Sequence, residues 1–62
     1  MQGVIKFFLS EKGYGFIEVE DGDDIFFHIS EVVNKPIKNG DSVEFDVLTN
    51  KHGEYAVGVT KV

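Results

Sequence analysis

The sequence predicts an all-β fold in which five short antiparallel strands form one small Greek-key barrel. Apolar residues come in short runs rich in Val, Ile and Phe, and turn-forming residues separate the runs. The chain has 62 residues, whereas a two-sheet sandwich of ordinary size needs about 100. Closure into a barrel also removes the exposed edges that five open strands would leave.

The five strands follow one another with only short connections. In chain order they are expected at Gln2–Leu9, Tyr14–Val19, Asp24–Ile29, Ser42–Leu48 and Glu54–Val62. In the first turn, Ser10–Gly13, the last residue can adopt a positive φ. The second turn contains the pair Asp21-Gly22, a strong hairpin signal, and Asn50–Gly53 forms a similar turn before the last strand.

The connection between the third and fourth strands differs from the others. Ser30 is expected to cap a single helical turn over Glu31–Val33, because its hydroxyl can accept a free amide. Pro36 then forces Lys35 into an extended conformation. This connection is too short for a crossover helix, so the sheet is expected to be antiparallel.

Side-chain alternation along the strands assigns each residue to the core or to solvent. Glu18 and Asp24 belong in water, so side chains of the same parity must face water with them. That parity places four ring-bearing side chains on one exposed face: Tyr14, Phe16, Phe26 and His28. The opposite parity predicts the core: Ile17, Val19, Ile25, Phe27, Ile29, Val43, Phe45 and Val47.

The first strand is ambiguous because it carries more apolar residues than one face can hold. With Ile5 in the core, Lys6 faces out, and a bulge can bring either Phe7 or Phe8 to the outer face. Parity does not decide between these two rings. Each exposed ring forfeits roughly 1.5–3 kcal/mol of possible burial, and a contiguous exposed apolar patch usually marks a binding surface.

Exposed rings interleaved with lysines suit single-stranded nucleic acid, since every base has a π-face and every nucleotide a phosphate. The overall charge argues the other way, because six Lys and no Arg stand against eleven Asp and Glu, giving −5. Lys6 and Lys12 nevertheless lie among the aromatic residues. The acidic clusters, Glu18–Asp24 and Glu44–Asp46, are expected elsewhere on the surface.

Two stretches resemble the ribonucleoprotein motifs of the cold-shock domain family. Lys12-Gly13-Tyr14-Gly15-Phe16-Ile17 is similar to the first motif, and Ile25-Phe26-Phe27-His28-Ile29 to the second. Lys6-Phe7-Phe8 resembles the Lys-Trp-Phe of the family, and Gly58-Val59-Thr60 resembles its closing Asn-Val-Thr. The resemblance covers nearly the whole chain, so residues 1–62 are expected to form one cold-shock-type domain.

This resemblance implies an oligonucleotide-binding (OB) fold that binds single-stranded RNA or DNA. It also implies an RNA chaperone with roles in transcription or translation regulation, and no enzymatic activity. The stacking residues that it implies are Phe7, Tyr14, Phe16, Phe26 and His28. Lys6 and Lys12 would meet phosphates or base edges. Secondary contacts are expected from Phe8, Asp24, Ile29 and His52.

Four departures from the family pattern predict weaker binding and a shorter footprint. Phe7 replaces a tryptophan, and Ile29 replaces an aromatic residue. The loop after Ser30 is about three residues shorter than in the family and lacks its aromatic side chain. His52 stands near a position where arginine is common.

Two other classes of function compete with nucleic-acid binding. A small barrel with exposed rings can be a protein-interaction module, and the charge of −5 would favour a basic partner. An enzyme is disfavoured, because His28 and Ser30 have no orienting acid and no pocket. The cysteine-free sequence fits a cytoplasmic, monomeric protein without cofactor, metal, membrane or small-molecule partner.

Overall fold

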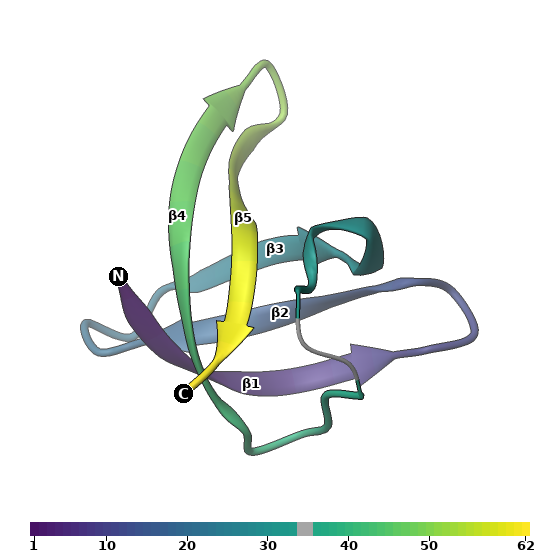
Figure 1. Cartoon of the computed structure of the whole chain (residues 1–62). Helices are drawn as coiled ribbons and strands as arrows, with labels where there is room; N and C mark the ends of the chain where they lie inside the picture. Colours follow the sequence, from purple (N-terminus) through teal and green to yellow (C-terminus); the bar gives the residue numbers. More distant parts are fainter. Residues whose placement is uncertain (34–35) are drawn as a thin grey trace.

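The structure is a computed structural model that describes residues 1–33 and 36–62, so the conformation expected of Lys35 lies outside the described residues. Its elements are β1 (Gln2–Leu9), β2 (Tyr14–Val19), β3 (Asp24–His28), the 3-10 turn η1 (Ile29–Glu31), β4 (Ser42–Asn50) and β5 (Gly53–Lys61). The strands close into a barrel in the order β1-β2-β3-β5-β4. Figure 1 shows the β4–β5 hairpin crossing β1, β2 and β3. The predicted five-stranded Greek-key barrel is confirmed.

One seam of the barrel is parallel, which differs from the expected antiparallel sheet. β3 pairs with β5 in parallel, through Phe26 with Tyr55 and Phe27 with Ala56. The other four neighbouring pairs are antiparallel. Strand directions cannot alternate all the way around a closed ring of five, so an odd-stranded barrel must contain a parallel seam.

The strand ends differ slightly from those expected. β3 stops at His28, one residue early, because Ile29 begins the 3-10 turn. β4 continues to Asn50, which pairs with Gly53 at the start of β5. The last residues of β4 are exposed on both faces, so no apolar alternation marks them as a strand.

The helical turn lies two residues earlier than predicted, and Ser30 is not its cap. His28 precedes the turn, and its Nδ1 accepts the backbone N–H of Ser30 at 3.1 Å. The same ring nitrogen lies 3.0 Å from the Ser30 hydroxyl. Val32 cannot continue the helix because it bridges in parallel to Val59 of β5.

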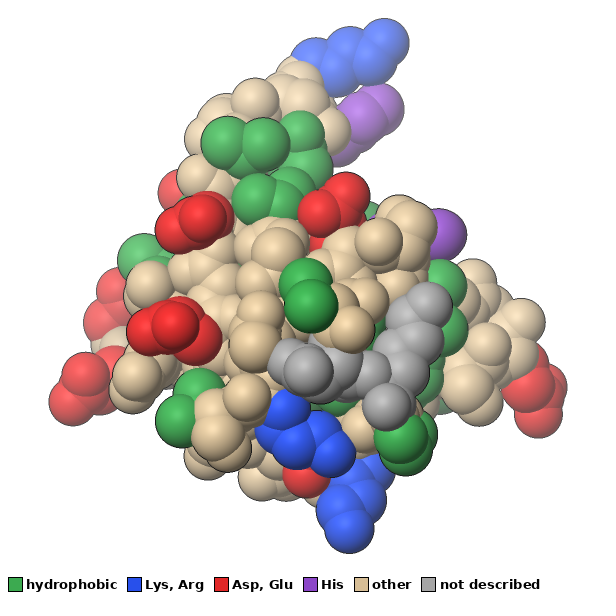
Figure 2. Space-filling model, in the orientation of Figure 1, with side chains coloured by type: hydrophobic (Ala, Val, Ile, Leu, Met, Phe, Trp, Pro, Cys, Tyr) green, Lys and Arg blue, Asp and Glu red, His purple; other side chains and the backbone are tan. Residues whose placement is uncertain are grey.

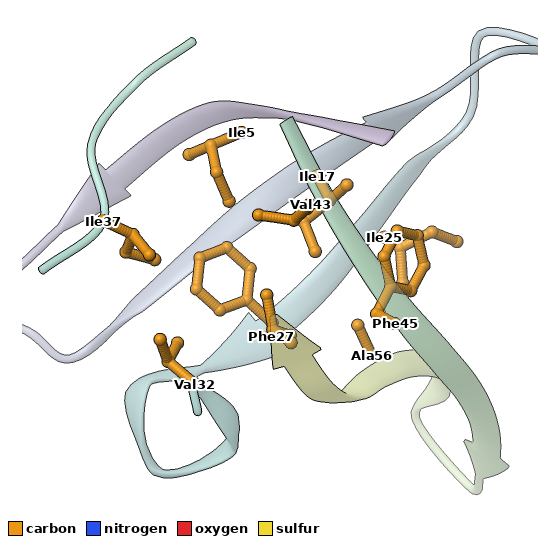
Figure 3. Packing of buried hydrophobic residues seen from close by; sticks show 10 residues of the cluster. Ile5, Ile17, Ile25, Phe27, Val32, Ile37, Val43, Phe45 and Ala56 are labelled. Atoms are coloured by element: carbon orange, nitrogen blue, oxygen red, sulfur yellow. The ribbon is translucent and has the colours of Figure 1, made fainter. Parts of the chain in front are cut away.

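The core contains six residues that the sequence assigned to it, Ile5, Ile17, Ile25, Phe27, Val43 and Phe45, and four that it did not, Val32, Ile37, Ala56 and Val59. Figure 3 shows these side chains converging from all five strands. Val19 and Val47 are partly buried against this cluster, whereas Ile29 is only half-buried in the 3-10 turn.

Gly15 allows β2 to approach the core closely. A Cβ atom at this position would overlap the carbonyl oxygen of Phe7 and lie 2.9 Å from two ring carbons of Phe27. Gly13, at the end of the β1–β2 turn, has φ 75° as predicted. Its carbonyl accepts the N–H of Ile29 at 2.9 Å, so this turn also secures the end of β3.

Candidate nucleic-acid interface

Paired residues on adjacent strands form a continuous row of apolar side chains across the outer face. Phe7 of β1 pairs with Phe16 of β2, which pairs with Phe26 of β3. Directly paired residues present their side chains on the same face of a sheet. The ring centroids of Phe7 and Phe16 are 5.3 Å apart, and those of Phe16 and Phe26 are 5.8 Å apart.

Tyr14 joins this row from the next position along β2. Its ring stacks on Phe26 with centroids 5.8 Å apart and an interplanar angle of 27°. It meets Phe16 edge-on at 6.5 Å. The parity prediction for these rings is therefore confirmed, with Phe26 38% exposed and Phe7, Tyr14 and Phe16 half-buried against one another. His28 pairs with Tyr14 and is exposed.

A bulge in β1 decides which of its two phenylalanines joins the row. The β1–β2 register shifts between Ile5 and Phe7, and Lys6 is the additional residue. The shift turns Phe7 to the outer face. Phe8 instead pairs with Gly15 and stacks on the core ring of Phe27 at 5.8 Å.

The five aromatic positions expected to stack on bases thus lie together on the outer face, while two of the secondary positions lie elsewhere. Phe8 and Ile29 line a separate, almost wholly apolar hollow with Ser10, Val32, Pro36 and Ile37. His52 and Asp24 lie beside the row, because both line a groove that also contains Phe16 and Phe26.

Lys6 forms an ion pair that the sequence analysis did not anticipate. Its Nζ donates to Oδ2 of Asp24 at 3.0 Å, and the two side chains are 48% and 35% exposed. The hydrogen bond and negative charge of Asp24 raise the pKa of Lys6 above its ordinary value of 10.5. Lys6 therefore remains a cation at neutral pH but is held by a carboxylate before any phosphate arrives.

The charges are distributed unevenly over the surface. In Figure 2, acidic side chains gather over β4 and the β2–β3 turn, and Glu44 and Asp46 on the outer face of β4 are exposed. Lys12 is exposed in the β1–β2 turn, next in sequence to Gly13 and Tyr14. The expectation that both acidic clusters lie away from the aromatic residues is wrong for the first of them, because Asp24 lines a groove with Phe16 and Phe26. Cations and a carboxylate therefore lie together beside the aromatic row, within a net charge of −5.

Tyr55 and Leu48 also belong to the row, although neither was predicted from the sequence. Tyr55 of β5 pairs with Phe26 across the parallel seam, and Leu48 of β4 pairs with Tyr55. Tyr55 is half-buried, and Leu48 is 50% exposed. No sequence signal indicated their position, because it depends on which strands meet when the barrel closes.

The described residues contain neither a cluster of metal ligands nor a membrane-spanning helix. Within residues 1–33 and 36–62, no group of three or more His, Asp or Glu side chains is placed to hold a metal ion. No helix in the same ranges is long and apolar enough to cross a membrane.

Comparison with known proteins agrees with this geometry. A family model described as the 'Cold-shock' DNA-binding domain matches residues 1–62. The chain belongs to the cold-shock domain family. It is 46% identical over 65 residues to the cold shock-like protein CspC of Bacillus cereus, with each chain fully covered.

Other relatives extend the comparison. Cold shock-like protein CspLB of Listeria monocytogenes is 48% identical over 63 residues, covering 97% of this chain and 96% of its own. Among solved structures, Drosophila Unr CSD456 superposes with a TM-score of 0.79 at 29% identity, over 98% of this chain. The present chain covers 26% of the length of that Drosophila chain.

Proposed function

We propose that this cold-shock domain binds unpaired RNA or DNA with little sequence preference and acts as an RNA chaperone. The observation that carries the proposal is the row of outward-facing rings on β1, β2 and β3, with Phe7, Phe16 and Phe26 directly paired. Base–aromatic stacking tolerates any sequence, because each base offers a π-face. Membership of a family of nucleic-acid-binding domains supports the same conclusion.

All the predicted site residues except His52 receive a role in this proposal. Bases stack on Phe7, Tyr14, Phe16, Phe26 and His28. Lys12 binds a phosphate directly, and Lys6 does so by exchanging the carboxylate of Asp24 for a phosphate oxygen. Phe8 and Ile29 contribute to the barrel rather than to stacking, because they line the separate apolar hollow.

The chaperone mechanism requires no energy source. The domain binds bases that are already unstacked and so shifts the equilibrium of an RNA hairpin toward its open form. Each stacked base contributes roughly 1–3 kcal/mol by alanine substitution. Three or four such contacts, reduced by the cost of ordering a flexible strand, place the affinity in the micromolar range.

The remaining properties are proposed on the same basis. Residues 1–62 act as one functional unit, as a monomer in the cytoplasm, without catalysis and without a small-molecule substrate. The absence of cysteine from the sequence is in keeping with that compartment.

The test is a titration of fluorescent oligo(dT) and oligo(U) at low and moderate salt. Phe16→Ala and Phe26→Ala should each weaken binding roughly five- to 150-fold. Val33→Ala is the matched control, since Val33 is 66% exposed and lies outside the row. Unchanged affinity in both phenylalanine variants would refute the stacking face.

A second measurement addresses the chaperone activity. A molecular-beacon hairpin should open as the protein is added, and a hairpin that stays closed under saturating protein would contradict strand trapping. The charge of −5 favours one other candidate, a module that binds basic peptides. Binding of a Lys-rich peptide, together with no binding of either oligonucleotide, would support that candidate instead.

A further inference from the structure

The apolar row does not end at β3, where the ribonucleoprotein-like motifs end. Tyr55 pairs with Phe26 across the parallel seam, and Leu48 pairs with Tyr55. The row therefore crosses all five strands in the order Phe7, Phe16, Phe26, Tyr55 and Leu48. The half of the row on β5 and β4 carries no role in the function proposed above.

A groove lies where the two halves of the row meet at the parallel seam, and it has room for a flat ring. Its apolar lining comes from Phe16, Phe26 and Tyr55, and its polar lining comes from Asp24, Asn50, His52, Gly53 and Glu54. The groove has a volume of about 580 Å³, which lies within the range of pockets that hold small organic groups. Most of its lining surface is apolar carbon.

The charges of the groove determine which part of a nucleotide can enter it. Asp24 and Glu54 place carboxylates in its lining, and like charges at short range repel. Asp24 is already paired with Lys6, so the carboxylate of Glu54 is the one that opposes a phosphate, and a neutral base is favoured over a phosphate at that end of the groove. A strand crossing this region would insert its base between the apolar side chains and keep its backbone outside, toward solvent.

We propose that Tyr55 is an additional stacking residue, and that a nucleobase of the bound strand occupies the groove between Phe26 and Tyr55. This inference rests on the proposed function. The bound strand then continues from the β1–β3 face across the parallel seam toward the β4–β5 turn. Tyr55 thereby replaces the stacking ring that is lost where Ile29 stands in place of an aromatic residue. The footprint of the bound strand then moves toward the β4–β5 hairpin and does not become shorter.

The tyrosines themselves provide the most direct test. The chain has no tryptophan and only two tyrosines, Tyr14 and Tyr55. In the Tyr14→Phe variant, all tyrosine emission comes from Tyr55, so a base stacked on that ring should quench it as oligo(dT) saturates the protein. Unchanged Tyr55 emission at saturation, established independently by a labelled oligonucleotide, would overturn the proposal.

An affinity series provides a second, independent test. The affinity of the wild type is measured for oligo(dT) of about four to about ten nucleotides. This series identifies the last added nucleotide that still strengthens binding, and the increment in affinity that it brings. Tyr55→Ala should abolish that increment, a loss of roughly five- to 150-fold, while shorter oligonucleotides bind as before. Tyr55→Phe should restore the increment, because the ring and not the hydroxyl stacks.

The two tests separate this inference from the function on which it rests. If the wild type binds no oligonucleotide, the proposed function fails. If the wild type binds and Phe26→Ala weakens binding, but Tyr55→Ala matches the wild type at every length, only the role of Tyr55 fails. Thermal unfolding of Tyr55→Ala, followed by circular dichroism, shows whether that variant is folded, and the Tyr14→Phe measurement does not depend on it.

Discussion

Lys6 has two possible partners, and they compete for the same ammonium group. In the free protein its Nζ lies 3.0 Å from Oδ2 of Asp24. Both side chains are substantially exposed, so the pair contributes little to stability. The ion pair instead affects binding. A phosphate must displace the carboxylate of Asp24 from Lys6 before Lys6 can neutralise that phosphate and release its counterions.

Asp24→Asn should therefore steepen the salt dependence of binding. Each phosphate contact on a single strand changes the slope of log K against log salt by roughly −0.7. Freeing Lys6 adds about one such contact, whereas Lys6→Gln should remove any contact that Lys6 already makes. Titrations of oligo(dT) over a range of salt concentrations measure both slopes. An identical slope in Asp24→Asn and the wild type would show that the ion pair does not limit the phosphate contact.

The pH dependence of the same contact has a definite sign. Asp24 raises the pKa of Lys6 above 10.5. The charge of Lys6 is therefore complete below its unfolded-state pKa and is lost only as pH rises through the higher folded-state value. Titrations between neutral and mildly alkaline pH should show no loss of affinity from this group. A decrease that is absent in Lys6→Gln would contradict this assignment.

Gly15 shows how one missing side chain supports both the core and the binding face. β2 carries Phe16 outward at the point where its backbone lies against Phe7 and Phe27. A larger residue at position 15 would push β2 away from these neighbours. The geometry of the row thus depends on a residue that contributes no side chain to it.

Gly15→Ala should destabilise the fold by about 1–3 kcal/mol or more, the usual cost of overpacking. Urea unfolding measures the change. Gly22→Ala is the comparison variant, because a Cβ there meets nothing within 4 Å and the only strain is its φ of 96°. A smaller loss of stability at position 15 than at position 22 would contradict the close approach described here.

At the scale of single elements, the bulge in β1 reverses the parity of everything after it. Without the extra residue at Lys6, Phe7 would share the inward face with Ile5, and Phe8 would point outward. The bulge exchanges them, so that Phe7 faces Phe16 and Phe8 stacks on Phe27. A single inserted position thereby places one ring in the interface and the next in the barrel.

The two adjacent phenylalanines should accordingly respond to substitution in opposite ways. Phe8→Ala should lower the free energy of unfolding by roughly 2–3 kcal/mol, somewhat less than for a fully buried ring. Phe7→Ala should change stability little and weaken oligonucleotide binding several-fold. Urea unfolding and fluorescence titration of both variants test this directly. The reverse pattern would show that the strand has no bulge between Ile5 and Phe7.

The elements also show what the sequence alone could reveal. The bounds of β1 and β2 were predicted correctly, and the inward and outward faces of β2, β3 and β4 were predicted because charged residues such as Glu18, Asp24 and Glu44 alternate with apolar ones. β1 gave no such signal, since its outer face is largely apolar. The Lys6–Asp24 pair was missed because its members are 18 positions apart and meet only when β1, β2 and β3 align.

Across the whole molecule, closure of the ring creates features that no single strand encodes. The parallel seam follows from an odd number of strands, and Tyr55 reaches Phe26 only because of that seam. The seam is also short, since it contains two residue pairs, whereas β4 and β5 are paired from Val43 to Asn50. The isolated bridge between Val32 and Val59 extends it on the far side of the 3-10 turn.

The seam should therefore open more readily than the β1–β2 and β4–β5 hairpins. Hydrogen exchange monitored by NMR should show that amides bonded between β3 and β5 exchange faster than those within the β1–β2 and β4–β5 hairpins. Few hydrogen bonds and little local packing favour such sub-global opening. Equal protection around the ring would instead show that the barrel opens only by global unfolding.

A ligand that spans the row would change the lifetime of the protein itself. A strand whose bases lie on both Phe26 and Tyr55 would bridge the seam from outside, and binding to the closed form alone stabilises it by mass action. Proteases that cleave transiently opened chains would then degrade loaded copies more slowly than free ones. The supply of unpaired nucleic acid would in this way set how many copies of the protein persist.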